Sequence, residues 1–209
     1  MYWPEFLTIA VAHLFAVASP GPDFAVVTRQ SVSAGTRAGL WTSLGVGLGI
    51  LVHVSYCILG VAVLLSQSPV LFNGMKWVAA AYLSFLGIKA IRAALAGGAP
   101  AVVAADDASV RIGRAVLLGF LTNGLNPKAT LFFLALFTLV ISPQTPTVIQ
   151  VIYGIYLALA TFAWFALLSL LIGKPRVRRF LQGAGNWFEG GMGLVLILLA
   201  LQLLLTATI

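Results

Sequence analysis

The stretch ASPGPDF, residues 18–24, interrupts the first apolar run of the sequence, and NGLNPKA, residues 123–129, interrupts a later one. Their prolines lack an N–H donor and clash with the carbonyl four residues earlier, so a helix breaks there. An unpaired carbonyl in hydrocarbon is costly, and so is the charge that follows each break, Asp23 or Lys128. Both breaks are therefore expected to lie in the protein interior or beside a wet cavity.

The composition of the whole chain is that of a membrane protein. Of its 209 residues, 61% are hydrophobic and 8% are charged, whereas soluble domains carry about 25% charged residues. This excludes a soluble globular enzyme. The apolar runs are continuous rather than alternating, which favours helices over a β-barrel. We predict an all-α polytopic membrane protein with six transmembrane helices, at about 5–28, 39–66, 70–91, 115–140, 147–172 and 188–207.

The basic residues indicate the orientation of these spans. The formal net charge is +7, from 12 Lys and Arg against 5 Asp and Glu. Ten basic residues fall in or beside the loops of one side: Arg29, Arg37, Lys89, Arg92, Arg111, Arg114, Lys174, Arg176, Arg178 and Arg179. The other side has Lys76 alone. Basic loops stay in the cytoplasm, so both termini are expected outside. The positive charge does not indicate a nucleic-acid partner.

The two breaks also predict an internal repeat. Pro22-Asp23 and Pro127-Lys128 are 105 residues apart, about half of the chain. The halves, about 1–92 and 113–209, would each hold three spans and would be joined by a flexible cytoplasmic loop, 93–113. Because three is odd, the second half enters from the opposite side. This is the 3+3 inverted repeat of many transporters, and residues 1–209 then form a single transmembrane transport domain.

The residues at the breaks are the candidate site. A new half-helix after a break offers N–H groups to an anion, and the freed carbonyls suit a cation. The expected substrate-binding residues are Pro20, Gly21, Pro22, Asp23, Asn123, Asn126, Pro127 and Lys128. The candidates for proton coupling are Asp23, Lys128 and His53, and His13 has a weaker claim. A purely structural ion pair between Asp23 and Lys128 is the alternative.

Other features of the spans predict packing or exclude chemistry. Gly45 and Gly49 form a small-xxx-small pattern, whose usual role is close helix packing. Two histidines and Cys57, far apart in the chain, do not make a metal site, and no cofactor is expected. A nucleophile–base pair or a multi-histidine constellation is missing from the sequence, so a membrane enzyme is not expected.

Three motifs together resemble the LysE/RhtB family of bacterial amino-acid exporters. In order along the chain they are residues 19–23, residues 82–89, and residues 126–129 followed by Leu131-Phe132-Phe133. The resemblance covers the whole length. It implies a six-helix protein of the bacterial inner membrane that exports amino acids or close derivatives. Members of the family differ in substrate.

One intramembrane acid and one base suit a neutral zwitterion better than a dibasic substrate. We therefore expect a secondary active exporter of a neutral amino acid, working by proton antiport. The alternatives are an exporter of another small solute, such as a metal ion or a homoserine-lactone type metabolite, and a membrane scaffold without transport. The sequence leaves open which amino acid is exported, which ion is coupled, and whether the chain forms a homodimer.

Overall fold

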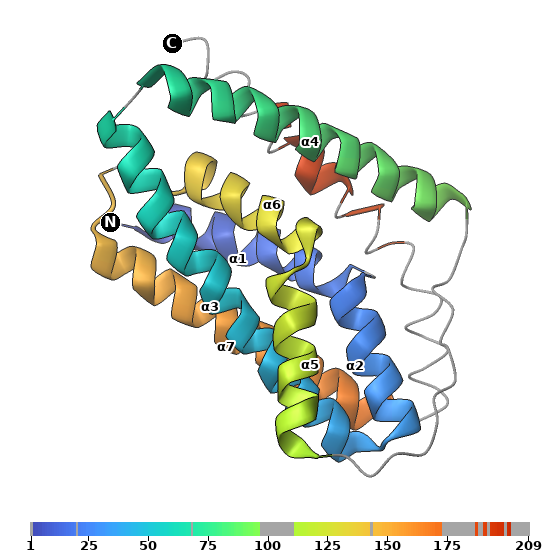
Figure 1. The fold of residues 1–209 in the computed structure, drawn as a ribbon. Coiled ribbons are helices and arrows are strands. Elements are labelled where there is room, and N and C mark those ends of the chain that lie inside the picture. Colours follow the sequence, from blue (N-terminus) through green and yellow to red (C-terminus); the bar gives the residue numbers. More distant parts are fainter. Residues whose placement is uncertain are drawn as a thin grey trace.

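The structure is a computed structural model of the 209-residue chain. It describes residues 2–19, 21–67, 69–96, 111–142 and 144–172, and a few near the C-terminal end: 187, 190–191, 193–198, 200 and 201. These residues form helices and their connections, with no strand among them. The all-helical prediction is confirmed for this part of the chain. Figure 1 shows the arrangement.

The first predicted span is two helices. Helix α1 (Trp3–Ala18) ends at Ser19, whose backbone is extended. Helix α2 (Pro22–Ser33) begins with Pro22, because a proline at the first helical position loses no hydrogen bond. The two helices are bent by 54° relative to each other. The predicted break is confirmed, although Pro20 itself lies outside the described residues.

Two long helices follow. Gly35, with φ +87°, turns the chain from α2 into α3 (Thr36–Gln67), and glycine adopts this left-handed conformation without a steric cost. Helix α4 (Pro69–Ala96) runs along one side of the bundle (Figure 1). It continues beyond the predicted end of the third span, so the connecting loop is shorter than 93–113. Residues 97–110 of that loop lie outside the described residues.

The fourth predicted span is broken as well. Helix α5 (Ile112–Gly124) ends before Leu125, and helix α6 (Pro127–Ala135) continues into a short π-helix, η1 (Leu136–Val140). Figure 1 shows α5 and α6 running in clearly different directions. Helix α7 (Thr147–Leu171) matches the fifth predicted span almost to the residue. Half of the sixth predicted span, 188–207, lies outside the described residues, and those of its residues that are described are helical.

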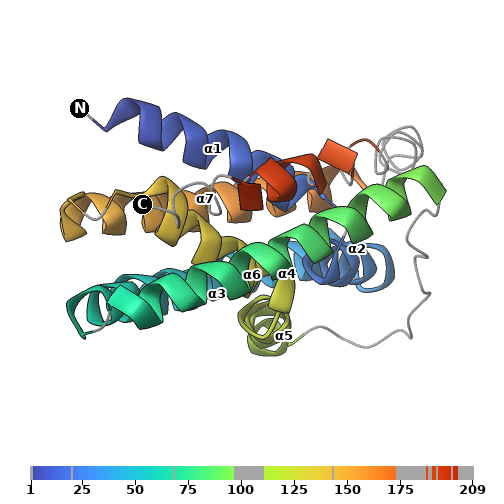
Figure 2. The ribbon, with the colours of Figure 1, turned by 90° about the horizontal axis from the view of Figure 1, so that it is seen from above.

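Helix α3 is the centre of the fold, packed between α5 and α7 (Figures 1 and 2). Small residues allow the α3–α5 contact. A side chain at Gly45 would run into the backbone carbonyl of Val116, and one at Gly119 would run into that of Thr42. The two helix backbones therefore touch, as the Gly45–Gly49 pattern predicted.

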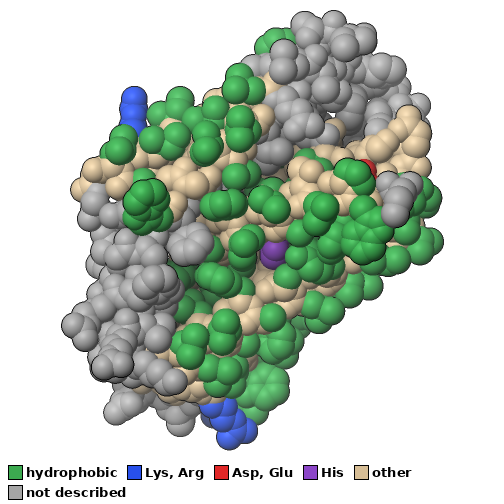
Figure 3. Space-filling view, turned by 180° about the vertical axis from the view of Figure 1, so that it is seen from behind, with side chains coloured by type: hydrophobic (Ala, Val, Ile, Leu, Met, Phe, Trp, Pro, Cys, Tyr) green, Lys and Arg blue, Asp and Glu red, His purple; other side chains and the backbone are tan. Residues whose placement is uncertain are grey.

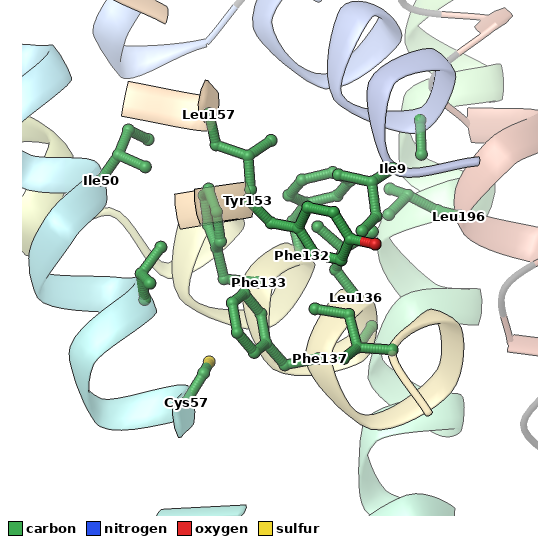
Figure 4. Packing of buried hydrophobic residues seen from close by; sticks show 14 of the residues in the cluster. Ile9, Ile50, Cys57, Phe132, Phe133, Leu136, Phe137, Tyr153, Leu157 and Leu196 are labelled. Atoms are coloured by element: carbon green, nitrogen blue, oxygen red, sulfur yellow. The ribbon is translucent and has the colours of Figure 1, made fainter. Parts of the chain in front are cut away.

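The interior and the exterior are both apolar. Aromatic and aliphatic side chains from α1, α3, α6 and α7 form the main core (Figure 4). Hydrophobic side chains also dominate the face in Figure 3, as expected where lipid replaces water. Two described helical segments, Thr36–Gly60 and Thr147–Leu171, are long and apolar enough to cross a membrane, and the bent pair α1–α2 would make a third.

Candidate functional site

The two breaks meet at one cavity. The cavity and its mouth together enclose about 490 Å³ of space between the atoms, part of which is open to the outside. Helices α1, α2, α3, α5, α6 and α7 all contribute to its wall. The lining residues are His13, Ala16, Val17, Ser19, Gly21, Asp23, Phe24, Ile50, Asn123, Asn126, Lys128, Ala129, Phe132, Phe133, Thr161 and Phe165. Segments 100 residues apart in the sequence thus form one polar pole, made of Ser19, Asp23, Asn123, Asn126 and Lys128, and most of the remaining wall is apolar.

Asp23 is held in place by the second break. Its Oδ2 accepts hydrogen bonds from Asn123 Nδ2 at 2.9 Å and from Asn126 Nδ2 at 3.2 Å. Its other oxygen, Oδ1, is enclosed and has no hydrogen-bond partner among the described residues. A buried carboxylate oxygen without a partner is costly, since it loses its hydration and gains nothing in return. This atom is therefore a candidate to receive a ligand or a proton.

Lys128 reaches back to the first break. Its Nζ donates a hydrogen bond to Ser19 Oγ at 2.6 Å, and the side chain lies close to Gly21. The lysine also acts electrostatically on the Asp23 carboxylate. The acid of the first break is therefore held by amides of the second, while the base of the second break is bonded to a serine of the first. The two charges share one pole of the cavity.

Asn126 links the two halves of this arrangement. It is the N-cap of α6, and its Oδ1 accepts a hydrogen bond from the Lys128 backbone N–H at 3.0 Å. Asparagine is among the preferred N-cap residues for this reason. Its Nδ2 is left to bond Asp23. The backbone N–H of Lys128, in the first turn of α6, is thus bonded to the protein itself. A ligand would therefore meet the charged and amide side chains of the site rather than this N–H group.

His53 lies behind the cavity rather than in its wall. Its ring is fully buried on α3, and Nε2 lies 3.0 Å from the carbonyl oxygen of Asn123. A carbonyl can only accept, so Nε2 carries the proton in this contact. In the neutral ring Nδ1 is then an acceptor, and it lies 2.7 Å from the hydroxyl of Tyr56. His53 therefore supports the α5–α6 break through a backbone carbonyl at its edge.

The structure brings together five of the sequence-predicted site residues in the cavity wall: Gly21, Asp23, Asn123, Asn126 and Lys128. Pro22 and Pro127 begin α2 and α6 next to it. The sequence reasoning gave no site role to Thr161 or the phenylalanines, and only a minor one to His13. Within long apolar helices nothing in the local sequence marks the face that meets a cavity. Among the described residues, no three His, Cys, Asp or Glu side chains gather as metal ligands would.

Comparison with known proteins agrees with this arrangement. The profile of the LysE type translocator family matches residues 14–207. The threonine efflux protein of Escherichia coli K12 is 31% identical over 190 residues, which cover 90% of this chain and 91% of the relative. The leucine efflux protein of Klebsiella pneumoniae is 31% identical over 193 residues, 89% of each chain. No solved structure matches the chain.

The chain therefore belongs to the LysE family of translocators. Members of this family move solutes rather than convert them, so the protein is a transporter and not an enzyme. A cavity that buries both charged breaks is consistent with that role.

Proposed function

We propose that this LysE family member exports a neutral amino acid across the bacterial inner membrane in exchange for protons. The observation that carries the proposal is the cavity in which Asp23, Asn123, Asn126 and Lys128 face the same empty space. The named relatives are efflux proteins for threonine and for leucine, two neutral amino acids. Amino-acid export is therefore the function that both the site and the family favour.

The polar pole suits a zwitterion. The substrate's ammonium group would meet Asp23 Oδ1, the carboxylate oxygen that lacks a partner. Its carboxylate would meet the Lys128 ammonium group, assisted by Ser19. Charge-assisted hydrogen bonds of this kind are about twice as strong as neutral ones. A dibasic substrate would bring a second positive charge to a site with one acid, so a neutral amino acid fits better. Gly21, Pro22 and Pro127 shape the backbone around this pole.

Proton exchange provides the driving force. A zwitterion has no net charge, so the membrane potential does not act on it. An inward proton gains about 2.3 kcal/mol per 100 mV, while each tenfold concentration ratio costs about 1.4 kcal/mol. Asp23 is the first candidate for the coupling group, because Oδ1 can take up a proton without breaking either amide bond to Oδ2. Lys128 is the second candidate and His53 the third.

We further propose six spans in a 3+3 inverted repeat, with both termini in the periplasm. Two observations support this. The predicted breaks of the two halves lie at the same cavity. The end of α2, the start of α3 and the start of α5, which carry Arg29, Arg37, Arg111 and Arg114, lie together at one end of the bundle (Figure 1), as the positive-inside rule requires of cytoplasmic ends. The whole chain then forms one transport domain.

The test is transport by the purified protein in proteoliposomes loaded with a panel of radiolabelled amino acids. We expect an imposed pH gradient to drive concentrative transport of one or more neutral amino acids, and dibasic ones to move slowly. Vesicles without protein are the control. Transport of a metal ion or of a homoserine lactone, with no amino acid moving, would replace the proposal by one of its alternatives. Amino-acid transport unaffected by the pH gradient would remove proton coupling alone.

A further inference from the structure

A second polar group lines the cavity away from its charged pole. His13 of α1 and Thr161 of α7 both belong to the wall, and both are almost completely buried. His13 Nε2 lies 2.9 Å from Thr161 Oγ1. The neighbouring wall is apolar and includes Phe132, Phe133 and Phe165. Polar side chains in such surroundings are costly unless they are hydrogen-bonded. His13 and Thr161 meet this requirement by bonding each other across two helices.

The positions of these residues show how the cavity extends. His13, Ala16 and Val17 line it at positions i, i+3 and i+4, which form one face of α1. Along that helix His13 lies roughly 9 Å from Ser19, six residues at the α-helical rise. A small amino acid with a hydrogen bond of about 2.9 Å at each end spans a distance of that order. A substrate bound at the charged pole would thus point its side chain toward His13.

The Thr161 hydroxyl is used in an unusual way for this protein. Among the described helices, most serine and threonine hydroxyls that form a hydrogen bond donate it to the carbonyl four residues earlier, as Thr42 does to Ala38 and Thr138 does to Leu134. That bond satisfies the hydroxyl within its own helix. Thr161 is paired with His13 instead. Its hydroxyl is therefore presented at the cavity wall rather than folded back onto α7.

The histidine retains hydrogen-bonding capacity. The contact with Thr161 uses Nε2 and leaves the second ring nitrogen, Nδ1, outside that hydrogen bond. In a neutral imidazole one nitrogen donates and the other accepts. Whichever tautomer is present, Nδ1 can pair with a hydroxyl group, since a hydroxyl both donates and accepts. An aliphatic side chain can satisfy neither tautomer.

We infer that His13 and Thr161 form the side-chain subsite of the transporter and select substrates whose side chain carries a hydroxyl group. This inference rests on the proposed amino-acid export and adds the residues that determine specificity. Sites built to hydrogen-bond a substrate hydroxyl reject analogues that lack it. Here His13 and Thr161 also satisfy each other when no hydroxyl is present. The expected discrimination is therefore about tenfold, or about 1.4 kcal/mol, rather than several orders of magnitude.

Threonine and valine test the inference, because valine has the shape of threonine with a methyl group in place of the hydroxyl. In proteoliposomes we expect the wild-type protein to transport threonine with a kcat/KM about tenfold above that for valine. His13→Leu and Thr161→Val should each lower the threonine value about tenfold and leave the valine value within a factor of about two. Thr138→Val is the matched control, since that hydroxyl bonds its own helix outside the cavity, and it should keep the wild-type ratio.

Each outcome decides a separate point. If both variants leave the threonine-to-valine ratio of kcat/KM unchanged, whether or not transport falls, the pair is only a structural contact between α1 and α7. The inference is then wrong, while amino-acid export stands. If the wild-type protein moves no amino acid at all, the proposed function fails first. Should His13→Leu be missing from the membrane, Thr161→Val decides, because it preserves the shape of the side chain.

Discussion

Gly49→Ala should disrupt the site, although Gly49 lies on α3, a helix that contributes no charged side chain to the cavity wall. Gly49 lies on α3 against Asn123, and a Cβ there would be 2.7 Å from Asn123 Oδ1 and 2.8 Å from Asn123 Cβ. Ordinary van der Waals contact starts at 3.4 Å, so the asparagine must retreat by about 0.7 Å in a densely packed interior. The same side chain holds Asp23 through a 2.9 Å hydrogen bond.

The magnitude follows from that displacement. A shift of about 0.7 Å along the line from Asp23 Oδ2 to Asn123 Nδ2 would stretch their hydrogen bond to about 3.6 Å, which no longer counts as one. A misplacement of about 1 Å at a functional group costs up to about 100-fold in rate. We therefore expect transport to fall about 10- to 100-fold. The crowded contact should also cost about 1–3 kcal/mol of stability.

The assay is the initial transport rate per inserted protein, together with thermal unfolding of the purified variant. Gly60→Ala is the matched control: it lies on the same helix, and no atom of the described residues comes within 4 Å of a Cβ there. Alanine favours a helix over glycine by about 1 kcal/mol, so this variant should transport normally and be no less stable. Adding Asn123→Ser to Gly49→Ala relieves the contact and should restore stability but not transport. A Gly49→Ala protein that transports at the wild-type rate would refute the role given to Asn123.

Other changes test the remaining parts of the proposal. The Asp23→Asn protein should stay folded and inserted but lose pH-driven concentration of substrate. Lys128→Ala should raise the KM at least about tenfold by removing a charge-assisted contact. If both single changes prevent insertion and a double apolar replacement restores it, the structural ion-pair alternative is right. Glu5→Ala should lower the melting temperature, because its carboxylate accepts hydrogen bonds from Ser142 N and two hydroxyl groups, worth about 1–3 kcal/mol if their donors are left unpaired. Reporter fusions after residues 100 and 180 should read cytoplasmic and a C-terminal fusion periplasmic, and a cytoplasmic C-terminus would contradict the inverted repeat.

The sequence predicted the breaks because their signal is local. A proline beside a charge is costly in a bilayer wherever the rest of the chain lies, so residues 19–23 and 123–128 could be identified without knowing their neighbours. Their proximity in space was expected for the same reason, since two buried charges of opposite sign are cheapest near each other and near water. The bounds of α3 and α7 were also predictable, because an apolar run ends where polar residues begin.

The rest of the site depends on which helix faces lie together, and no local pattern determines this. His13 and Thr161 are 148 residues apart and make one hydrogen bond. In a soluble helix the apolar face identifies the interior, but a membrane helix is apolar on all sides. His53 shows the same limit. As a lone intramembrane histidine it suggested proton transfer, but no local pattern indicated the contacts with Asn123 and Tyr56 that place it beside the break.

The contacts of Asp23 favour the proposed transport site over the structural ion pair. An ion pair kept for stability is expected to have all its buried oxygens satisfied, because each unsatisfied one costs about 1–3 kcal/mol or more when charged. Asp23 instead uses one oxygen for two amides and leaves the other enclosed without a partner. That arrangement gives up stability at the point where the two broken helices meet. An oxygen without a partner can accept a substrate's ammonium group or a proton without first giving up a bond within the protein.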